Sequence, residues 1–450
     1  MKSMASSTNG SRFALTSVLA LALGTMALDL FAVNPEAEQY WPQWRGPHAT
    51  GVATNGNPPM TWNETTNILW KIEIAGRGSS SPVIWGDRIF VQTAIPTGTP
   101  SGVASHTPRG ALTPRELHRF VVYAIDRATG TIVWERTAAE LVPHEASHSE
   151  NGTWASSSPV TDGEHVFAFF DSFGLYAYDM NGTLIWQNDL GDKHMRNEFG
   201  EGSTPALHGN FIVVVWDQMG GPSFVVTLDK RTGAERWRVG RDEIDTWATP
   251  LVLEHQGRAQ VMTAGQNKLR SYDLETGEIV WEAPGVTMNP IPSPVAAEGM
   301  VYFTSGFRGN NLKAIRLADA RGDLTGSSAI VWTLDRDTPY VPSPLLYEGV
   351  IYVLKRNSAI LSAFDAKTGA PHYQVQRLEG LGEVFSSPVA VNGRVYITDR
   401  DGRTLVIKSG PTYEVLATNT LDDGFDASPA IVGDIIYMRG YRYLYAIGAQ

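Results

Sequence analysis

The chain contains no cysteine among its 450 residues. This absence excludes disulfide bonds, iron–sulfur clusters, cysteine-ligated zinc, a thiol nucleophile and a lipid anchor on an N-terminal cysteine. Charged residues make up only 18% of the chain, and the net charge is −11 without any basic block, so we expect no nucleic-acid-binding surface. Apolar residues reach 42%, which is enough for a large folded core.

The first 32 residues have the pattern of a secretory signal peptide. Lys2 and Arg12 are the only charges before an apolar run over residues 13–28, and residues 30–32 offer a small-residue cleavage site. The alternative is an uncleaved membrane anchor, although 16 apolar residues are short for a span that needs about 20. We therefore expect an exported protein of the periplasm or cell envelope, with no transmembrane span in the mature chain.

A Ser/Thr-Pro pair followed by a short apolar strand recurs through the chain. Six of the seven spacings between successive prolines are 41–50 residues, close to the period of a four-stranded propeller blade. We call the Ser or Thr of each pair an anchor. The anchors are Ser81, Ser158, Thr204, Thr249, Ser293, Ser343, Ser387 and Ser428.

A second phrase recurs within the units and predicts a β-hairpin. An apolar strand ends in Asp, a turn contains Gly, and Trp begins the next strand, as in residues 227–237 (TLDKRTGAERW). The Asp accepts turn N–H groups, the Gly supplies a positive φ, and the Trp ring is placed to wedge between blades. The last unit lacks its outer strand, and residues 67–72, which include Trp70, resemble the missing piece.

These observations predict an all-β fold: one eight-bladed β-propeller of four-stranded antiparallel blades over residues 67–450, preceded by a lead-in over residues 33–66. The N-terminal strand closes the ring within the C-terminal blade, so that no open edges remain there. We expect a monomer.

Inserts at residues 94–118 and 138–154 stretch the first spacing, and such inserts map to loops on one face, often the binding face.

The A-x-D-x-x-T-G-x-x-x-W phrase resembles the repeat of quinoprotein-type β-propellers, a family that includes pyrroloquinoline quinone (PQQ) dehydrogenases and the outer-membrane assembly protein BamB. The opening phrase WPQWRGP (residues 41–47) is similar to the lead-in of exported BamB-like members. In the dehydrogenases, the resemblance implies a quinone held by a Trp and a disulfide of adjacent cysteines, with Ca²⁺ beside it. This chain lacks those cysteines, so we name no catalytic residue.

The resemblance favours a non-catalytic scaffold that binds a protein partner at the cell envelope. The alternative is a propeller that binds PQQ or another small molecule, with PQQ-dependent oxidation and a Ca²⁺ site as its enzymatic form. The residues just before the anchors are expected to rim the central channel, where they are candidate ligand contacts or ordinary packing residues. These rim residues are Arg77, Asn151, Trp154, Glu201, Trp247, Asn289, Tyr340, Glu383 and Asp426.

Two local patterns have a plainer interpretation than the motif they match. His144 and His148 lie in an H-E-x-x-H sequence, which binds zinc when it is helical, but the segment reads as a polar loop between two strands. Metal binding by these two histidines stays open as a hypothesis. The sequence Asp399-Arg400-Asp401-Gly402 lacks the remaining ligands of a calcium loop and predicts a hairpin turn.

Overall fold

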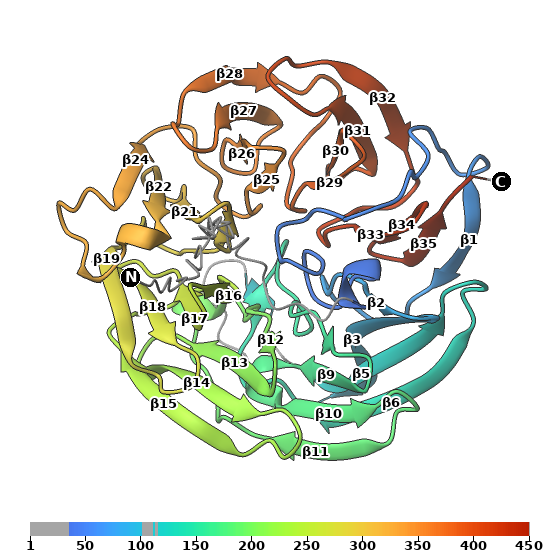
Figure 1. The fold of residues 1–450 in the computed structure, drawn as a ribbon. Helices are drawn as coiled ribbons and strands as arrows, with labels where there is room; N and C mark the ends of the chain where they lie inside the picture. Colours follow the sequence, from blue (N-terminus) through green and yellow to red (C-terminus); the bar gives the residue numbers. More distant parts are fainter. Residues whose placement is uncertain (1–35, 101–110, 113–115, 450) are drawn as a thin grey trace, which may run out of the picture.

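The computed structural model describes residues 36–100, 111–112 and 116–449. The predicted signal peptide over residues 1–32 lies outside them. Eight antiparallel sheets are arranged around a central axis, which confirms the predicted all-β, eight-bladed propeller (Figure 1). Blades are numbered here in chain order of their innermost strands.

The first four blades follow one another along the chain, each with its strands ordered from the axis outward. Blade 1 contains β2 (Val83–Trp85), β3 (Arg88–Pro100), β5 (Glu116–Asp126) and β6 (Ile132–Leu141). Blade 2 contains β8 (Val160–Thr161), β9 (His165–Phe169), β10 (Leu175–Asp179) and β11 (Leu184–Asn188). Blade 3 contains β12 (Ala206–His208), β13 (Phe211–Trp216), β14 (Ser223–Asp229) and β15 (Glu235–Arg241). Blade 4 contains β16 (Leu251–His255), β17 (Arg258–Thr263), β18 (Lys268–Asp273) and β19 (Ile279–Pro284).

The remaining blades continue this order. Blade 5 contains β20 (Val295–Ala297), β21 (Met300–Ser305), β22 (Asn311–Arg316) and β24 (Ile330–Leu334). Blade 6 contains β25 (Leu345–Tyr347), β26 (Val350–Leu354), β27 (Ile360–Asp365) and β28 (Pro371–Arg377). Blade 7 contains β29 (Val389–Val391), β30 (Arg394–Thr398), β31 (Arg403–Lys408) and β32 (Val415–Thr420). Blade 8 contains β33 (Ala430–Val432), β34 (Ile435–Arg439), β35 (Tyr443–Ile447) and β1 (Ile68–Glu73).

A few short elements lie outside this scheme. They are the 3₁₀ helices η1 (Ala37–Gln39), η2 (Asp171–Phe173), η3 (Arg196–Glu198) and η4 (Leu317–Asp319) and the two-residue strands β4 (Ala111–Leu112), β7 (Ser147–His148) and β23 (Gly322–Asp323). The described residues contain no helix with the length and hydropathy needed to cross a membrane.

The two ends of the propeller meet in blade 8. β1 pairs antiparallel with β35, with Lys71 opposite Tyr445 and Glu73 opposite Tyr443. The outer strand missing from the C-terminal unit is therefore supplied from the N-terminal side, as the sequence predicts. Figure 1 shows β1 on the rim beside β35, close to the C-terminus.

The eight anchors form a closed ring of hydrogen bonds. The backbone N–H of each anchor donates to the hydroxyl of the anchor in the next blade, at distances between 2.9 and 3.1 Å. The last bond, from Ser428 to Ser81 at 2.9 Å, joins blade 8 to blade 1. A Ser or Thr lies two residues before each inner strand, and its hydroxyl satisfies a buried N–H of the neighbouring blade.

The repeated Trp joins five of the eight outer strands to the following blade. In blade 2, the Trp186 Nε1–H donates to the Lys230 carbonyl at 2.9 Å, and the ring lies against Gly233, the turn glycine of blade 3. An added Cβ at Gly233 would lie 2.7 Å from the Trp186 ring. The same bond is made by Trp70, Trp134, Trp237 and Trp332. This repeated contact confirms that the Trp ring packs between blades.

The lead-in crosses the axis on one face. Trp41 forms a bridge to Ile84 of blade 1, and Ala53 pairs with Ala390 of blade 7. Between these points Trp44 donates to Ser428 of blade 8 at 3.4 Å, and Arg45 donates to the Pro344 carbonyl of blade 6 at 2.7 Å. The same segment also accepts the Thr161 N–H of blade 2 at the Pro42 carbonyl, and Ala49 packs against the core of blade 4. Because blades 4 and 8 lie opposite each other, the lead-in lies over the channel. We call this side, where the first and second strands of each blade are joined, the turn face.

Candidate functional site

The opposite side carries the segments that precede the anchors, and we call it the loop face. It also receives the segment from the second insert, residues 142–154, and the long β3–β5 hairpin of the first insert. β4 of the first insert pairs antiparallel with β7 of the second. All nine predicted rim residues lie in the segments entering the inner strands, and we describe them by the contacts they make.

Arg400 links three of the predicted rim residues. It lies on the turn between β30 and β31, which confirms the predicted hairpin turn. Its Nε is 2.8 Å from Asp426 Oδ1, and its Nη1 donates to Asn151 Oδ1 at 3.0 Å. The exposed carboxylate of Glu383 lies 3.9 Å from Nη1. Burial raises the pKa of Asp426, and Arg400 acts in the opposite direction.

The second insert spans the mouth of the channel. At one end, Arg400 of blade 7 holds Asn151 and the Glu150 carbonyl, at 3.0 and 2.9 Å. At the other end, the His148 N–H donates at 3.1 Å to the carbonyl of Phe199, which precedes blade 3. Blades 3 and 7 lie on opposite sides of a ring of eight, so this segment crosses the axis. Arg400 thus fastens the insert in place.

Glu201 belongs to a buried cluster around Lys193. The Lys193 ammonium is 1% exposed and lies 3.0 Å from Asp171 and 3.8 Å from Glu201. Ser172 donates to Glu201 through its N–H and its hydroxyl, and Ser157 donates to Asp171 at 2.6 Å. Burial acts to lower the pKa of Lys193, but the two carboxylates raise it above its usual value. Burial raises the pKa of Glu201 to about 8, the Asp171 carboxylate raises it further, and the Lys193 ammonium acts in the opposite direction.

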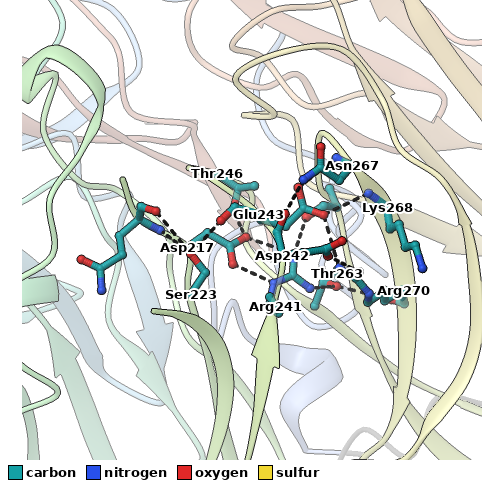
Figure 2. Close-up of polar contacts among 12 residues, drawn as sticks. Asp217, Ser223, Arg241, Asp242, Glu243, Thr246, Thr263, Asn267, Lys268 and Arg270 are labelled. Atoms are coloured by element: carbon teal, nitrogen blue, oxygen red, sulfur yellow. Dashed lines mark hydrogen bonds and ion pairs between the residues drawn. The ribbon is translucent and has the colours of Figure 1, made fainter. Parts of the chain in front are cut away.

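A second buried network joins blades 3 and 4 (Figure 2). Arg241 makes a bidentate ion pair with Asp217 at 2.7 and 3.0 Å, with both side chains fully buried. Its remaining N–H groups donate to Thr263, Tyr272 and the Ala264 carbonyl. Every guanidinium donor is thereby used, which is the condition under which a buried pair is tolerated.

The carboxylates near this network are also matched by cations or N–H groups. Glu243 accepts the N–H groups of Asn267 and Lys268 at 2.9 Å and lies 3.3 Å from Arg270. Asp245 pairs with Arg196 at 3.0 Å. The buried acids described above are therefore structural ion pairs, some within one blade and some between neighbouring blades.

The two tryptophans among the rim residues hold loops. Trp154 donates to the Glu145 carbonyl at 3.1 Å, and its ring centroid lies 4.7 Å from that of His118. Trp247 donates to the Gly200 carbonyl at 2.8 Å. Both side chains are partly buried and packed, which is the ordinary packing role that the sequence leaves open for them.

A cavity of about 440 Å³ lies on the part of the loop face formed by blades 5 to 7. Tyr340 stacks on Phe307 in its wall, with ring centroids 4.8 Å apart and planes inclined by 22°. Arg308 and Arg356 line the same cavity, both with positive φ, at 49° and 55°. Glu383 also lines it. Strained arginines beside a stacked aromatic pair suit a planar or anionic ligand.

Two further rim residues do not line this cavity. Asn289 is buried, its side chain interacts with the Tyr340 hydroxyl, and among the described residues no hydrogen-bond partner reaches its Oδ1. Arg77 is exposed and forms backbone hydrogen bonds with Ala94 at the start of the first insert. The structure therefore brings Asn151, Glu383 and Asp426 together at Arg400, but it does not gather all nine rim residues into one pocket.

Residues 144–148 form a loop and the strand β7. A helical H-E-x-x-H site is therefore absent from this described segment. His144 lies beside Glu145 and His194, within one group of metal-ligating side chains. His148 is not a member of that group; its ring packs against Phe199 at a centroid distance of 5.0 Å. Metal binding by His144 and His148 stays a hypothesis; the structure places His144 beside His194, a proximity that no sequence motif indicated.

The repeats, the anchors and the lead-in can be compared with known proteins. The family model of the outer membrane protein assembly factor BamB matches residues 50–215 and 221–449. The chain belongs to the BamB family. No curated protein sequence matches it.

Solved structures share the fold of this BamB-family chain at low sequence identity. BamB from Moraxella catarrhalis is 13% identical, with a TM-score of 0.56 over 85% of this chain and 97% of that one. Quinohemoprotein alcohol dehydrogenase from Comamonas testosteroni is 11% identical, with a TM-score of 0.62 over 92% of this chain and 81% of that one. The designed protein Ika8 is 10% identical, with a TM-score of 0.52 over 87% of this chain and the whole of that one. Identities this low establish the propeller fold alone.

Proposed function

We propose that this BamB-family chain is an exported, monomeric, non-catalytic propeller that binds a protein partner at the cell envelope. The observation that carries the proposal is the second insert, which Arg400 fastens across the channel mouth through Asn151, Glu150 and Asp426. A channel mouth covered by a fixed segment offers a surface on which a partner can dock. A cofactor-dependent enzyme needs an open channel mouth whose side chains are available to bind the cofactor.

The residues present do not fit the Ca²⁺–quinone pair of the dehydrogenase neighbours. Ca²⁺ requires six to eight oxygen ligands. The buried carboxylates of the loop face are committed to Lys193, Arg241, Arg270, Arg196 and Arg400. The chain also lacks cysteine, and with it the disulfide that covers the quinone in that resemblance. The described residues of the loop face therefore offer no Ca²⁺–PQQ site.

The partner surface that we favour is the β3–β5 hairpin of the first insert. β3 and β5 are paired from Arg88 with Asp126 to Pro96 with His118 and, after an irregularity, at Pro100 with Glu116, well beyond the length of the hairpins in the other blades. Residues 96–99 are exposed near its end. A long paired hairpin gives a partner a rigid surface with a low ordering cost.

Site-specific photo-crosslinking tests this surface. A photoreactive residue at Thr99 or Leu117 is expected to give one discrete adduct in the cell envelope, because these positions flank the hairpin end. The control is Asp87, an exposed residue on the turn face. Equal adducts from Asp87, or none from either hairpin position, would contradict the proposal. Saturable, Ca²⁺-dependent PQQ binding in calorimetry would overturn it in favour of a cofactor.

A second candidate function is small-molecule binding in the Phe307–Tyr340 cavity, which the stacked pair and the two arginines favour. Titration with PQQ in the absence of Ca²⁺ examines it directly, since PQQ is a planar anion. Binding that is lost in Arg356→Ala and Tyr340→Ala supports this candidate, and binding that survives both substitutions removes it.

A further inference from the structure

The structure joins His144, Glu145 and His194 into one compact group on the loop face. A ring nitrogen of each histidine and a carboxylate oxygen of Glu145 all lie within 4.8 Å of one another. His144 and Glu145 come from the second insert, and His194 comes from the loop between β11 and η3. We propose that this group binds one divalent transition-metal ion of the Zn²⁺ class, beyond the protein-binding function proposed above.

His144 has the hydrogen-bonding state of a metal ligand. Its Nε2 lies 2.9 Å from the Lys193 carbonyl, and a carbonyl oxygen only accepts, so Nε2 carries the proton. Nδ1 is then left with its lone pair. It is buried, and within the described residues no hydrogen-bond partner reaches it. Metal-bound histidines characteristically donate their other N–H to a backbone carbonyl in this way.

The other two ligands are also held in place. Glu145 Oε2 accepts the Met195 N–H at 3.0 Å, which leaves Oε1 2.7 Å from His194 Nδ1. The two imidazole rings face each other edge-on, with centroids 5.8 Å apart. The carboxylate of Asp192 lies 4.0 Å from His144 Nδ1 and adds negative charge beside the group.

The surroundings provide room and solvent access for an ion. A cavity of about 10 Å³ adjoins His144 and Glu145, about the space of one water molecule or ion. The His194 side chain is 57% exposed, so its ring can exchange the hydrogen bond to Glu145 for a bond to a metal. Tetrahedral zinc holds neighbouring donor atoms about 3.3 Å apart, at Zn–N lengths of about 2.0–2.1 Å.

The donor set selects the class of metal. Two imidazoles and one carboxylate suit zinc, cobalt, nickel and copper, whereas Ca²⁺ and Mg²⁺ prefer oxygen ligands. Three protein ligands also leave a coordination position open to water. A bound ion would join the second insert to the loop before blade 3, next to the point where His148 bonds to Phe199.

A second group of similar residues on the turn face provides a contrast. Asp162, Glu164 and His165 also place their ligand atoms within 4.8 Å of one another. There, however, the Lys230 ammonium lies 2.7 Å from Asp162 and already neutralises the carboxylate. We therefore place the metal in the His144 group alone.

Calorimetric titration of the tag-free mature protein with Zn²⁺ tests the proposal. We expect one ion per chain, and a rise in Tm on adding Zn²⁺. His194→Ala is expected to weaken binding by about 100-fold or more, since loss of an outer-shell partner alone costs about 10–100-fold. Because His194 is exposed, this variant keeps the fold. His144→Ala should behave likewise.

His148→Ala is the matched control, since it removes a histidine of the same loop, and His165→Ala reports on the turn-face group. Both should bind Zn²⁺ as the parent does. No saturable Zn²⁺ binding by the parent protein, or undiminished binding by His194→Ala, would overturn the proposal. Co²⁺ in place of Zn²⁺ adds a visible absorption spectrum, which should disappear in His144→Ala and His194→Ala and remain in the two control variants.

Discussion

Lys313 on β22 is a buried ammonium group whose acceptors are neutral. Its side chain is 7% exposed, and Nζ donates to the Gly285 carbonyl and to Asn311 Oδ1, both at 2.7 Å. Burial lowers the pKa of Lys313 to about 8, whereas the unfolded chain holds it near 10.5. Between these two values the folded protein binds fewer protons, so its stability rises with pH across this window.

We expect this residue to give a measurable pH dependence. The free energy of unfolding should increase by about 1–2 kcal/mol from pH 7.5 to pH 10 through Lys313, after allowance for solvent screening. Lys313→Met keeps the volume and removes the titration, so urea unfolding of this variant should show a flatter pH profile. Identical profiles for the two proteins would show that the ammonium is better solvated than its burial suggests.

Arg45 in the lead-in is a second buried cation whose hydrogen-bond acceptors are neutral. Its side chain is 1% exposed, and Nη2 donates to the Thr50 and Pro344 carbonyls, but within the described residues no partner reaches Nε or Nη1. Burial lowers the pKa of Arg45 to about 9. The lead-in is thus anchored by carbonyl contacts in place of an ion pair.

At the scale of the element, the contact of Trp with the turn glycine is the repeated interblade unit. Gly233 has φ of +70°, and a Cβ there would lie 2.7 Å from the Trp186 ring. Gly233→Ala therefore adds backbone strain and a ring clash. We expect it to lower the free energy of unfolding by about 2–4 kcal/mol, measured by chemical denaturation.

The variant Gly209→Ala, in the same blade, separates the cost of backbone strain from the cost of the ring clash. Gly209 also has a positive φ, of +55°, but apart from its chain neighbours no atom of the described residues lies within 4 Å of its added Cβ. Only the backbone strain remains, with a cost of about 1–2 kcal/mol. If both variants lose the same stability, the Trp186 ring yields to the methyl group and the contact is looser than described.

Blade 5 shows what replaces this unit where the sequence departs from it. The turn is extended by η4 and β23, and β23 pairs in parallel with β19, the outer strand of blade 4. Trp281 of β19 is 1% exposed and packs among Leu317, Ala320 and Leu324 of the extension. The extension also covers the edge of β19, which lowers the risk of edge-to-edge association there.

At the scale of the whole molecule, the register of β1 against β35 decides whether the ring is closed. The chain has no cysteine, so a pair of engineered cysteines reports on it without interference. Glu73 and Tyr443 are directly paired, and the Cα separation of antiparallel partners is compatible with a disulfide. Oxidised Glu73→Cys/Tyr443→Cys should be about 2–4 kcal/mol more stable than its reduced form.

The control pair is Glu73→Cys/Leu444→Cys, which is shifted by one residue. A shift of one residue places the two side chains on opposite faces of the sheet, so this pair should stay reduced. Disulfide formation in the control, or failure of the Glu73–Tyr443 pair to oxidise, would show that β1 adopts another register.

Features that occur in every blade could be predicted from the sequence, and features that occur once could not. Eight anchors and a recurring Trp reveal the blades because each copy supports the others. Arg400 and Lys193 occur only once and act on residues brought near by the fold; Arg400 and Asn151 are 249 positions apart. The pairing of His144 with His194 likewise depends on how two irregular loops pack, which no local pattern encodes.

The anchor ring also has an electrical consequence for the channel. All eight N–H groups donate in the same rotational sense, so the tangential components of their bond dipoles circulate around the axis and cancel. The eight hydrogen bonds therefore produce no net electric field perpendicular to the axis at the level of the anchors. Arg45, which donates to the Pro344 carbonyl directly after one of the anchors, places a cationic side chain beside this ring.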